Sequence, residues 1–153
     1  MEELAELHRF NVWANRNLLA GVRRLSAEQL DEQRDGMYDP ILKVLRHLVQ
    51  VEYVYLRMVR GLAPERLGED LTLDQLAAVL EETGAGLVEA ARSASPEARV
   101  HIPWFGRDFA APQCLRQVLT HSANHRADVN QWLPRFGVES THQDYIGLAL
   151  QEG

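Results

Sequence analysis

Residues 115–137, LRQVLTHSANHRADVNQWLPRFG, have the pattern of one long helix that carries two histidines. Pro112 stands just before this stretch, where its missing N–H has no cost, and Gly137 ends it. His121 and His125 are four residues apart, so their rings point about 40° apart on one helix face. Apolar residues share that arc, which places the pair at the interior or its edge. A metal ion bound by both rings is the sharpest explanation of this pattern.

The histidine pair also has a simpler interpretation. A single His-x-x-x-His spacing is a weak metal signal, and two histidines at the core boundary can instead bond to the backbone or to nearby Asn and Asp. Catalytic metal sites usually take three protein ligands and leave one position for water or substrate. His47, at the border of the apolar face of another predicted helix, is the best third candidate. His8, His101 and His142 could be merely solvated.

Composition indicates one globular domain over residues 1–153. Hydrophobic residues make up 46% and charged residues 25% of the chain, which is ordinary for a soluble protein. A net charge of -6 without a basic cluster argues against nucleic-acid binding. The single cysteine, Cys114, excludes an intramolecular disulfide and favours the cytoplasm. We expect no membrane association, because the sequence has neither a signal-peptide pattern nor an apolar run of about 20 residues.

Three further long helices are predicted before the histidine stretch. Residues 2–24 carry apolar side chains at helical spacing, and residues 40–60 are apolar over most of their circumference. Residues 72–93 have one apolar face but contain Gly84 and Gly86, which weaken a helix. Glycines kept inside a helix predict a close packing contact or a bend.

Two shorter patterns complete the prediction of an all-α four-helix bundle. Ser26 and Thr72 each precede a Gln by three residues, the capping-box pattern that begins a helix. Residues 99–111, RVHIPWFGRDFAA, are rich in β-branched and aromatic residues around Gly106 and predict a short β-hairpin. The hairpin falls between the third and fourth long helices. In such bundles, sites are built from side chains on facing helices.

The order of these motifs resembles the DinB family, also described as DinB/YfiT-like metalloenzymes, over nearly the whole chain. The shared elements are Asn11-Val12-Trp13-Ala14-Asn15 in the first helix, Arg46-His47-Leu48 followed by Glu52 in the second, and His121 to Arg126 in the last. The resemblance implies a four-helix bundle in which His47, His121 and His125 bind one divalent metal ion, commonly Zn²⁺ or Ni²⁺.

The resemblance leaves the activity open between two reaction classes. Some relatives are thiol S-transferases that use a low-molecular-weight thiol, and others are metal-dependent hydrolases. A metal with an open position suits both, because it lowers the pKa of bound water to about 7 or stabilises a thiolate. Lys43, Arg46 and Arg57 are candidate anchors for a thiol cofactor and favour the transferase. Asp128 and Glu52 are candidates for a general base or for a residue that orients a metal ligand.

The expected partners are a small-molecule substrate and a second copy of the chain. The family resemblance and the aromatic residues Trp104, Phe105 and Phe109 predict a homodimer, since exposed aromatic residues often mark an interface. A third hypothesis belongs to a different functional class. In it the metal is structural or absent, and the bundle serves binding or dimerisation.

Overall fold

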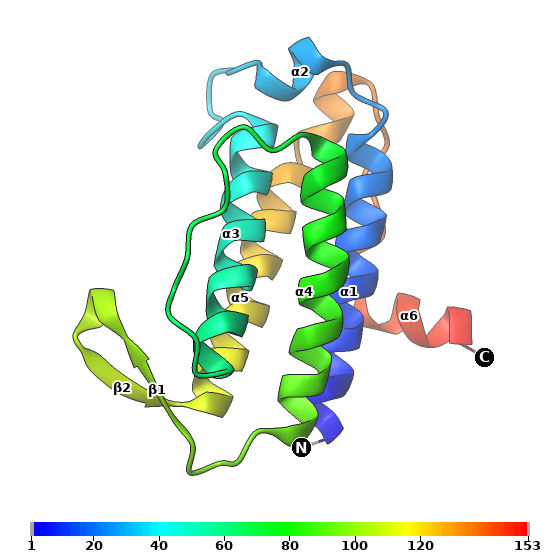
Figure 1. Ribbon diagram of the computed structural model, residues 1–153. Helices are drawn as coiled ribbons and strands as arrows, with labels where there is room; N and C mark the ends of the chain where they lie inside the picture. Colours follow the sequence, from blue (N-terminus) through cyan, green and yellow to red (C-terminus); the bar gives the residue numbers. More distant parts are fainter. Residues whose placement is uncertain (1, 153) are drawn as a thin grey trace.

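The computed structural model describes residues 2–152, and four long helices that lie along one another dominate it (Figure 1). They are α1 (Glu2–Val22), α3 (Ile41–Val59), α4 (Leu73–Ser93) and α5 (Ala111–Asn130). Helices α1 and α3 each pack against both α4 and α5, which closes the bundle around one core. The predicted four-helix bundle is therefore confirmed.

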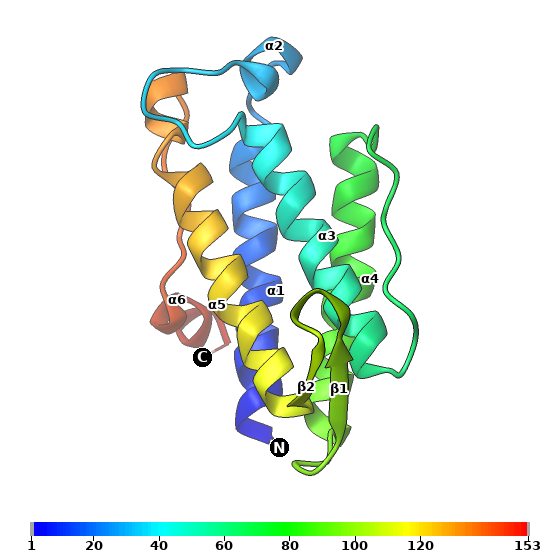
Figure 2. The same cartoon turned by 90° about the vertical axis from the view of Figure 1, so that its left-hand side faces the viewer.

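Two short helices and one hairpin pack against this bundle or connect its helices. Helix α2 (Ala27–Asp31) lies in the connection between α1 and α3, and α6 (Tyr145–Glu152) lies beside α1 near the chain end. Strands β1 (Arg99–Ile102) and β2 (Arg107–Ala110) pair antiparallel, with Val100 opposite Phe109. The hairpin lies against α3 and α5, as Figure 2 shows. Its position between α4 and α5 in the chain confirms the prediction.

Local signals in the sequence set several boundaries correctly. Ser26 and Thr72 both form the predicted capping box, in which side chain and backbone exchange hydrogen bonds with a Gln three residues later. Gly61 follows α3 with a φ of 74°, and Gly106 allows the hairpin turn with a φ of 62°. Side chains with a Cβ rarely adopt such positive φ values, so glycine suits both turns.

The last long helix differs from its prediction at both ends. It begins at Ala111, four residues earlier than expected, with Pro112 inside its first turn, where a missing N–H is harmless. It ends at Asn130 and is followed by a 3₁₀ helix, Leu133–Phe136. Pro134 explains the end, because it has no N–H to donate to the carbonyl of Asn130 and its ring would clash there. The expectation of one helix over residues 115–137 was therefore wrong beyond Asn130.

The apolar core is divided into two clusters along the bundle axis. One includes Leu18, Leu45, Leu76 and Leu133, and the other includes Ala5, Leu56, Leu87, Ile102 and Leu115. On α1, α3 and α5, buried polar residues lie between the two clusters: His8, Asn11, Asn15, Glu52, Ser122 and Arg126. The bundle therefore has a polar layer at mid-height.

Gly84 and Gly86 lie where neighbouring helices approach α4 closely. A Cβ built on Gly84 would lie 2.5 Å from Cγ2 of Val12, and one built on Gly86 would lie 2.6 Å from Cδ2 of Leu56. Helix α4 is continuous through both positions. The close packing contact predicted from the sequence is confirmed, and it explains why glycine is tolerated inside this helix.

The surface carries exposed aromatic side chains on the hairpin. Trp104 and Phe105 are 52% and 60% exposed, so both are accessible to a partner or ligand. The homodimer stays a prediction. Among the described helices, none combines the length and the apolar character that crossing a bilayer requires.

We predict that Gly84→Ala lowers the free energy of unfolding by about 1 kcal/mol or more, although alanine has the higher helix propensity. The added methyl group meets Val12, whose β-branched side chain has few alternative rotamers. Urea unfolding measures the effect. In a Val12→Ala background the obstructing methyl group is gone, so the same substitution should stabilise the protein. A stabilising effect in the wild-type background would contradict the packing argument.

Candidate metal centre

Three histidines from two facing helices converge at one point. His47 lies on α3, and His121 and His125 lie one turn apart on α5. One nitrogen from each ring can be chosen so that all three lie within 4.8 Å of one another. Nε2 of His47 is 3.0 Å from Nε2 of His121. The structure thus brings together the three residues that the sequence singled out.

The geometry and charge of this cluster fit a divalent ion. Two nitrogens bound to one tetrahedral Zn²⁺ at about 2.0–2.1 Å are roughly 3.3 Å apart, close to the separation of the His47 and His121 atoms. Burial, together with the neighbouring His125 and His47, lowers the pKa of His121 to about 4. Burial, and then His125, also lowers the pKa of His47. Both rings are therefore neutral at pH 7, the form that binds metals.

Asp128 lies beside one of these rings. Its Oδ2 is 3.4 Å from Nδ1 of His125, three residues earlier on α5. A carboxylate facing the Nδ1 side of a histidine orients the ring and leaves Nε2 for a metal. Asp128 lies within ion-pair distance of His125 without forming a hydrogen bond to it.

Glu52, the other acidic candidate, belongs to the buried polar layer. Its Oε1 accepts hydrogen bonds from Nδ2 of Asn11 at 2.8 Å, from Nδ2 of Asn15 at 3.0 Å and from Oγ of Ser122 at 2.6 Å. The side chain is fully buried. These three donors account for one carboxylate oxygen, and complete burial argues against Glu52 as a base that meets a substrate.

Arg126 completes this layer from α5. Its Nη1 donates to the side-chain oxygens of both Asn11 and Asn15, so the two asparagines connect it to Glu52. Burial lowers the pKa of Arg126 to about 10, which leaves it charged at pH 7. Ser122 and Arg126 each follow a cluster histidine by one residue and therefore point about 100° away from it around the helix. One face of α5 carries the histidines, and the adjacent face anchors the helix in the core.

Sequence reasoning missed this network. Asn11, Asn15 and Arg126 had been noted only as parts of the family motifs, with no hydrogen-bond partners predicted for them. All three are at most 4% exposed. A detectable signal was the four-residue spacing of two asparagines on an otherwise apolar helix face, since buried amides need hydrogen-bond partners.

A cavity of about 380 Å³ opens beside His47. Val51, Val54 and Tyr55 of α3 line it, together with Trp104 of the hairpin and the loop residues Pro64, Glu65 and Arg66. Gln50 also lines it and holds that loop, because its Nε2 donates to the carbonyl of Glu65 and its Oε1 accepts from the N–H of Leu67. The cluster therefore has a largely apolar space next to it, with charged groups on one side.

The three basic candidates for cofactor binding do not line this cavity. Each is engaged elsewhere: Lys43 with Asp39, Arg46 with the carbonyl of Leu71, and Arg57 with the carbonyl of Ala63. Arg66 is the basic side chain that shares the cavity with His47. Nothing in its local sequence indicated this, because a loop residue has no periodic pattern to place it.

The other three histidines lie outside the cluster. His101 is exposed on the hairpin, with Nδ1 2.7 Å from Oδ1 of Asp108, and His142 is exposed in the tail. His8 is 0% exposed, and burial lowers its pKa to about 4. The possibility that His8 is merely solvated was therefore wrong, because it is a neutral core residue.

Comparison with known proteins agrees with this architecture. The family model of the DinB superfamily matches residues 12–129. The chain is similar to the uncharacterized protein YizA of Bacillus subtilis, with 21% identity over 84% of each chain. Its fold is similar to the crystal structure of a DinB-like protein of Bacillus subtilis, YjoA, with a TM-score of 0.66 and 8% identity. That match covers 86% of this chain and 92% of the other.

We predict that Arg126→Met lowers the free energy of unfolding by about 3–5 kcal/mol, because it leaves the Glu52 charge buried without its counter-charge. Arg23→Met is the matched control: Arg23 pairs with Asp74 at 3.2 Å on the surface, and its loss should cost at most about 1 kcal/mol. Chemical denaturation measures both. Adding Glu52→Gln to Arg126→Met should cost less than the sum of the single changes. Equal effects of the two arginine substitutions would refute the network's role.

Proposed function

The chain belongs to the DinB superfamily, and on this basis we propose that it is a metal-dependent enzyme in which His47, His121 and His125 hold one divalent ion, Zn²⁺ or Ni²⁺. The observation that carries the proposal is the convergence of three imidazole nitrogens within 4.8 Å. When bound, such an ion acts as a Lewis acid that lowers the pKa of a thiol or water in its open position.

We propose thiol S-transfer, with a low-molecular-weight thiol as co-substrate, as the reaction class. A free thiol has a pKa of about 8.5, so it needs far less help to ionise than water does. A separate base is therefore dispensable for the thiol, whereas hydrolysis benefits from one that orients and deprotonates the metal-bound water. Of the described carboxylates near the site, Glu52 is buried in the core network, Glu65 pairs with Arg57 at 3.0 Å, and Asp128 lies 3.4 Å from His125.

The cavity side chains have separate tasks in this proposal. Val51 and Val54 supply apolar walls that exclude water from the reacting groups. Arg66 is placed to bind an acidic or polar group of the thiol by a charge-assisted hydrogen bond. Asp128 orients the His125 ring, and Gln50 holds the loop that carries Arg66 against α3.

Metal-dependent hydrolysis is the second candidate, and one observation favours it. Glu65 lines the cavity beside His47 and is 58% exposed, so exchange of its ion pair with Arg57 would free a carboxylate to act as a general base. The two reactions differ in whether a thiol is consumed, which makes them separable by assay.

We predict that His47→Ala, His121→Ala and His125→Ala each abolish retention of one metal equivalent per chain after dialysis, because two neutral ligands hold an ion poorly against water. Metal content measured on the folded proteins tests this. Asp128→Asn should retain the ion but weaken its affinity about 10- to 100-fold, as expected for a side chain that orients a ligand.

His8→Ala and His142→Ala serve as the matched controls for this experiment. Neither histidine lies in the cluster, so both variants should keep a full equivalent of metal. A full equivalent in His47→Ala combined with loss in His101→Ala or His142→Ala would show that the ligand assignment is wrong.

We predict that the metal-loaded protein conjugates a low-molecular-weight thiol to chlorodinitrobenzene, forming a C–S bond, breaking the C–Cl bond and releasing chloride and a proton. Arg66→Ala should raise the KM for the thiol about tenfold with little change in kcat. Lys43→Ala is the matched control, because Lys43 pairs with Asp39 outside the cavity, and its KM should not change. An ester and amide panel is run in parallel. Hydrolysis without thiol consumption would support the second candidate and exclude the first.

A further inference from the structure

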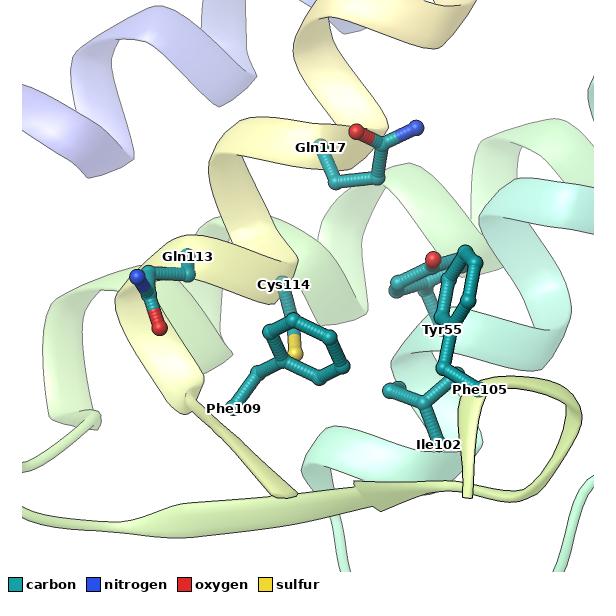
Figure 3. A pocket seen from close by; sticks show the side chains of 7 residues that line it. All are labelled: Tyr55, Ile102, Phe105, Phe109, Gln113, Cys114 and Gln117. Atoms are coloured by element: carbon teal, nitrogen blue, oxygen red, sulfur yellow. The ribbon is translucent and has the colours of Figure 1, made fainter. Parts of the chain in front are cut away.

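A second cavity, of about 300 Å³, lies between the hairpin and the first turns of α5. We call it the hairpin pocket; Tyr55, Ile102, Phe105, Phe109, Cys114 and Gln117 line it, and Gln113 also contributes. Figure 3 shows these side chains, which come from α3, α5 and the hairpin. Its size is at the lower end of the range for small-molecule sites.

The hairpin pocket lies next to the cavity beside His47. Tyr55 lines both spaces. The Trp104 ring, which lines the cavity, lies 5.9 Å from the ring of Tyr55 and 6.2 Å from that of Phe105, which lines the pocket. On α5, Gln117 lies one turn before His121 and therefore on nearly the same face. This adjacency suits a molecule long enough to reach from the histidine cluster past Tyr55 into the pocket.

The groups lining the hairpin pocket are uncharged. Burial raises the pKa of the Cys114 thiol and that of the Tyr55 hydroxyl, so both stay protonated at pH 7. The side-chain oxygen of Gln113 accepts from the N–H of Ala110, which leaves its NH₂ as a donor. The Gln117 amide offers one more donor and one acceptor. Burying a charge among these groups would be unfavourable, whereas a neutral apolar ligand with a polar atom fits.

A ligand bound in the hairpin pocket would explain why aromatic rings of the hairpin are exposed in the free protein. Phe105 is 60% exposed although it forms a T-shaped contact with Phe109, with 5.8 Å between ring centroids. Exposed rings at the edge of a concave apolar site gain contact area when a ligand covers them. Concavity favours a small molecule over a second copy of the chain, because stable protein interfaces need about 800 Å² from each partner.

We propose that the hairpin pocket binds the uncharged, aromatic or branched apolar part of the substrate whose reacting end lies at the histidine cluster. The part of this proposal that places the reacting end of the substrate at the histidine cluster rests on the proposed function. The binding of a neutral apolar group rests on the pocket alone. The pocket thereby selects acceptors that carry such a group and rejects acceptors that are charged in that part.

A pair of fluorescent probes tests the pocket directly. Phenylnaphthylamine is neutral, and anilinonaphthalene sulfonate has nearly the same aromatic skeleton with one negative charge. We expect saturable binding of the neutral probe and at least about tenfold weaker binding of the sulfonate. Tighter binding of the sulfonate would overturn the proposal and point to Arg107, whose guanidinium lies 5.4 Å from the centre of the Phe109 ring.

Substitutions of residues that line the hairpin pocket test whether phenylnaphthylamine binds there. Phe105→Ala and Phe109→Ala should each weaken phenylnaphthylamine binding about three- to tenfold through lost ring contacts. Gln117→Glu, a change at an exposed helix position, should weaken it by placing a charge at the pocket. Tyr38→Ala is the matched control: Tyr38 is 79% exposed and does not line the pocket, so binding should be unchanged. An equal effect of Tyr38→Ala, or no effect of the pocket variants, would overturn the proposal.

The proposal for the metal centre and the proposal for the hairpin pocket can be refuted independently. Phenylnaphthylamine should bind the His121→Ala protein as tightly as the wild type, because the pocket does not include that histidine. If the wild-type protein binds phenylnaphthylamine but transfers no thiol, the proposed reaction is refuted while the proposal for the hairpin pocket still holds. Absence of probe binding, together with a dimer in sedimentation that Phe105→Ala dissociates, would show that this face joins two copies and would overturn the pocket.

Discussion

The buried charge pair of Glu52 and Arg126, connected through Asn11 and Asn15, is the constraint on which the rest of the structure depends. A buried carboxylate and guanidinium are tolerated only where hydrogen bonds and opposite charge replace water. These four residues belong to α1, α3 and α5, so satisfying them fixes the height of three helices relative to one another. The apolar clusters above and below supply burial energy, but leucine contacts alone tolerate sliding far better than a hydrogen-bonded layer does.

This layer also determines where the histidines meet. Ser122 and Arg126 are held in the core, and the residues just before them are His121 and His125. Glu52 is held in the same layer, and His47 precedes it on α3 by five residues. Rotation or translation of either helix would separate the ring nitrogens that now lie within 4.8 Å. A metal centre on rigid helices needs such support, because its ligands must stay close to one geometry.

The two cavities depend on segments outside the four long helices. The loop after α3 and the hairpin before α5 supply Arg66, Trp104 and Phe105, while the helices supply His47 and Tyr55. Loops on a rigid scaffold can change without disturbing the core. Under the proposed function, the bundle supplies the reacting groups, and the loop and the hairpin select the substrate.

Local patterns in the sequence were sufficient for the bundle, the capping boxes, the hairpin and the close approach at Gly84, because these depend on periodicity and on nearest neighbours. The spacing of His121 and His125 likewise set their common face. Only the tertiary structure could show that Asp128 faces His125, that Arg66 lines the cavity instead of Lys43, and that Asn11 and Asn15 connect two buried charges. The Asp128–His125 contact lies within one turn of α5 and depends on the side-chain rotamers, whereas the other contacts join residues that are distant in the chain or lie in loops without periodicity. Their partners are chosen by helix packing, which no local pattern encodes.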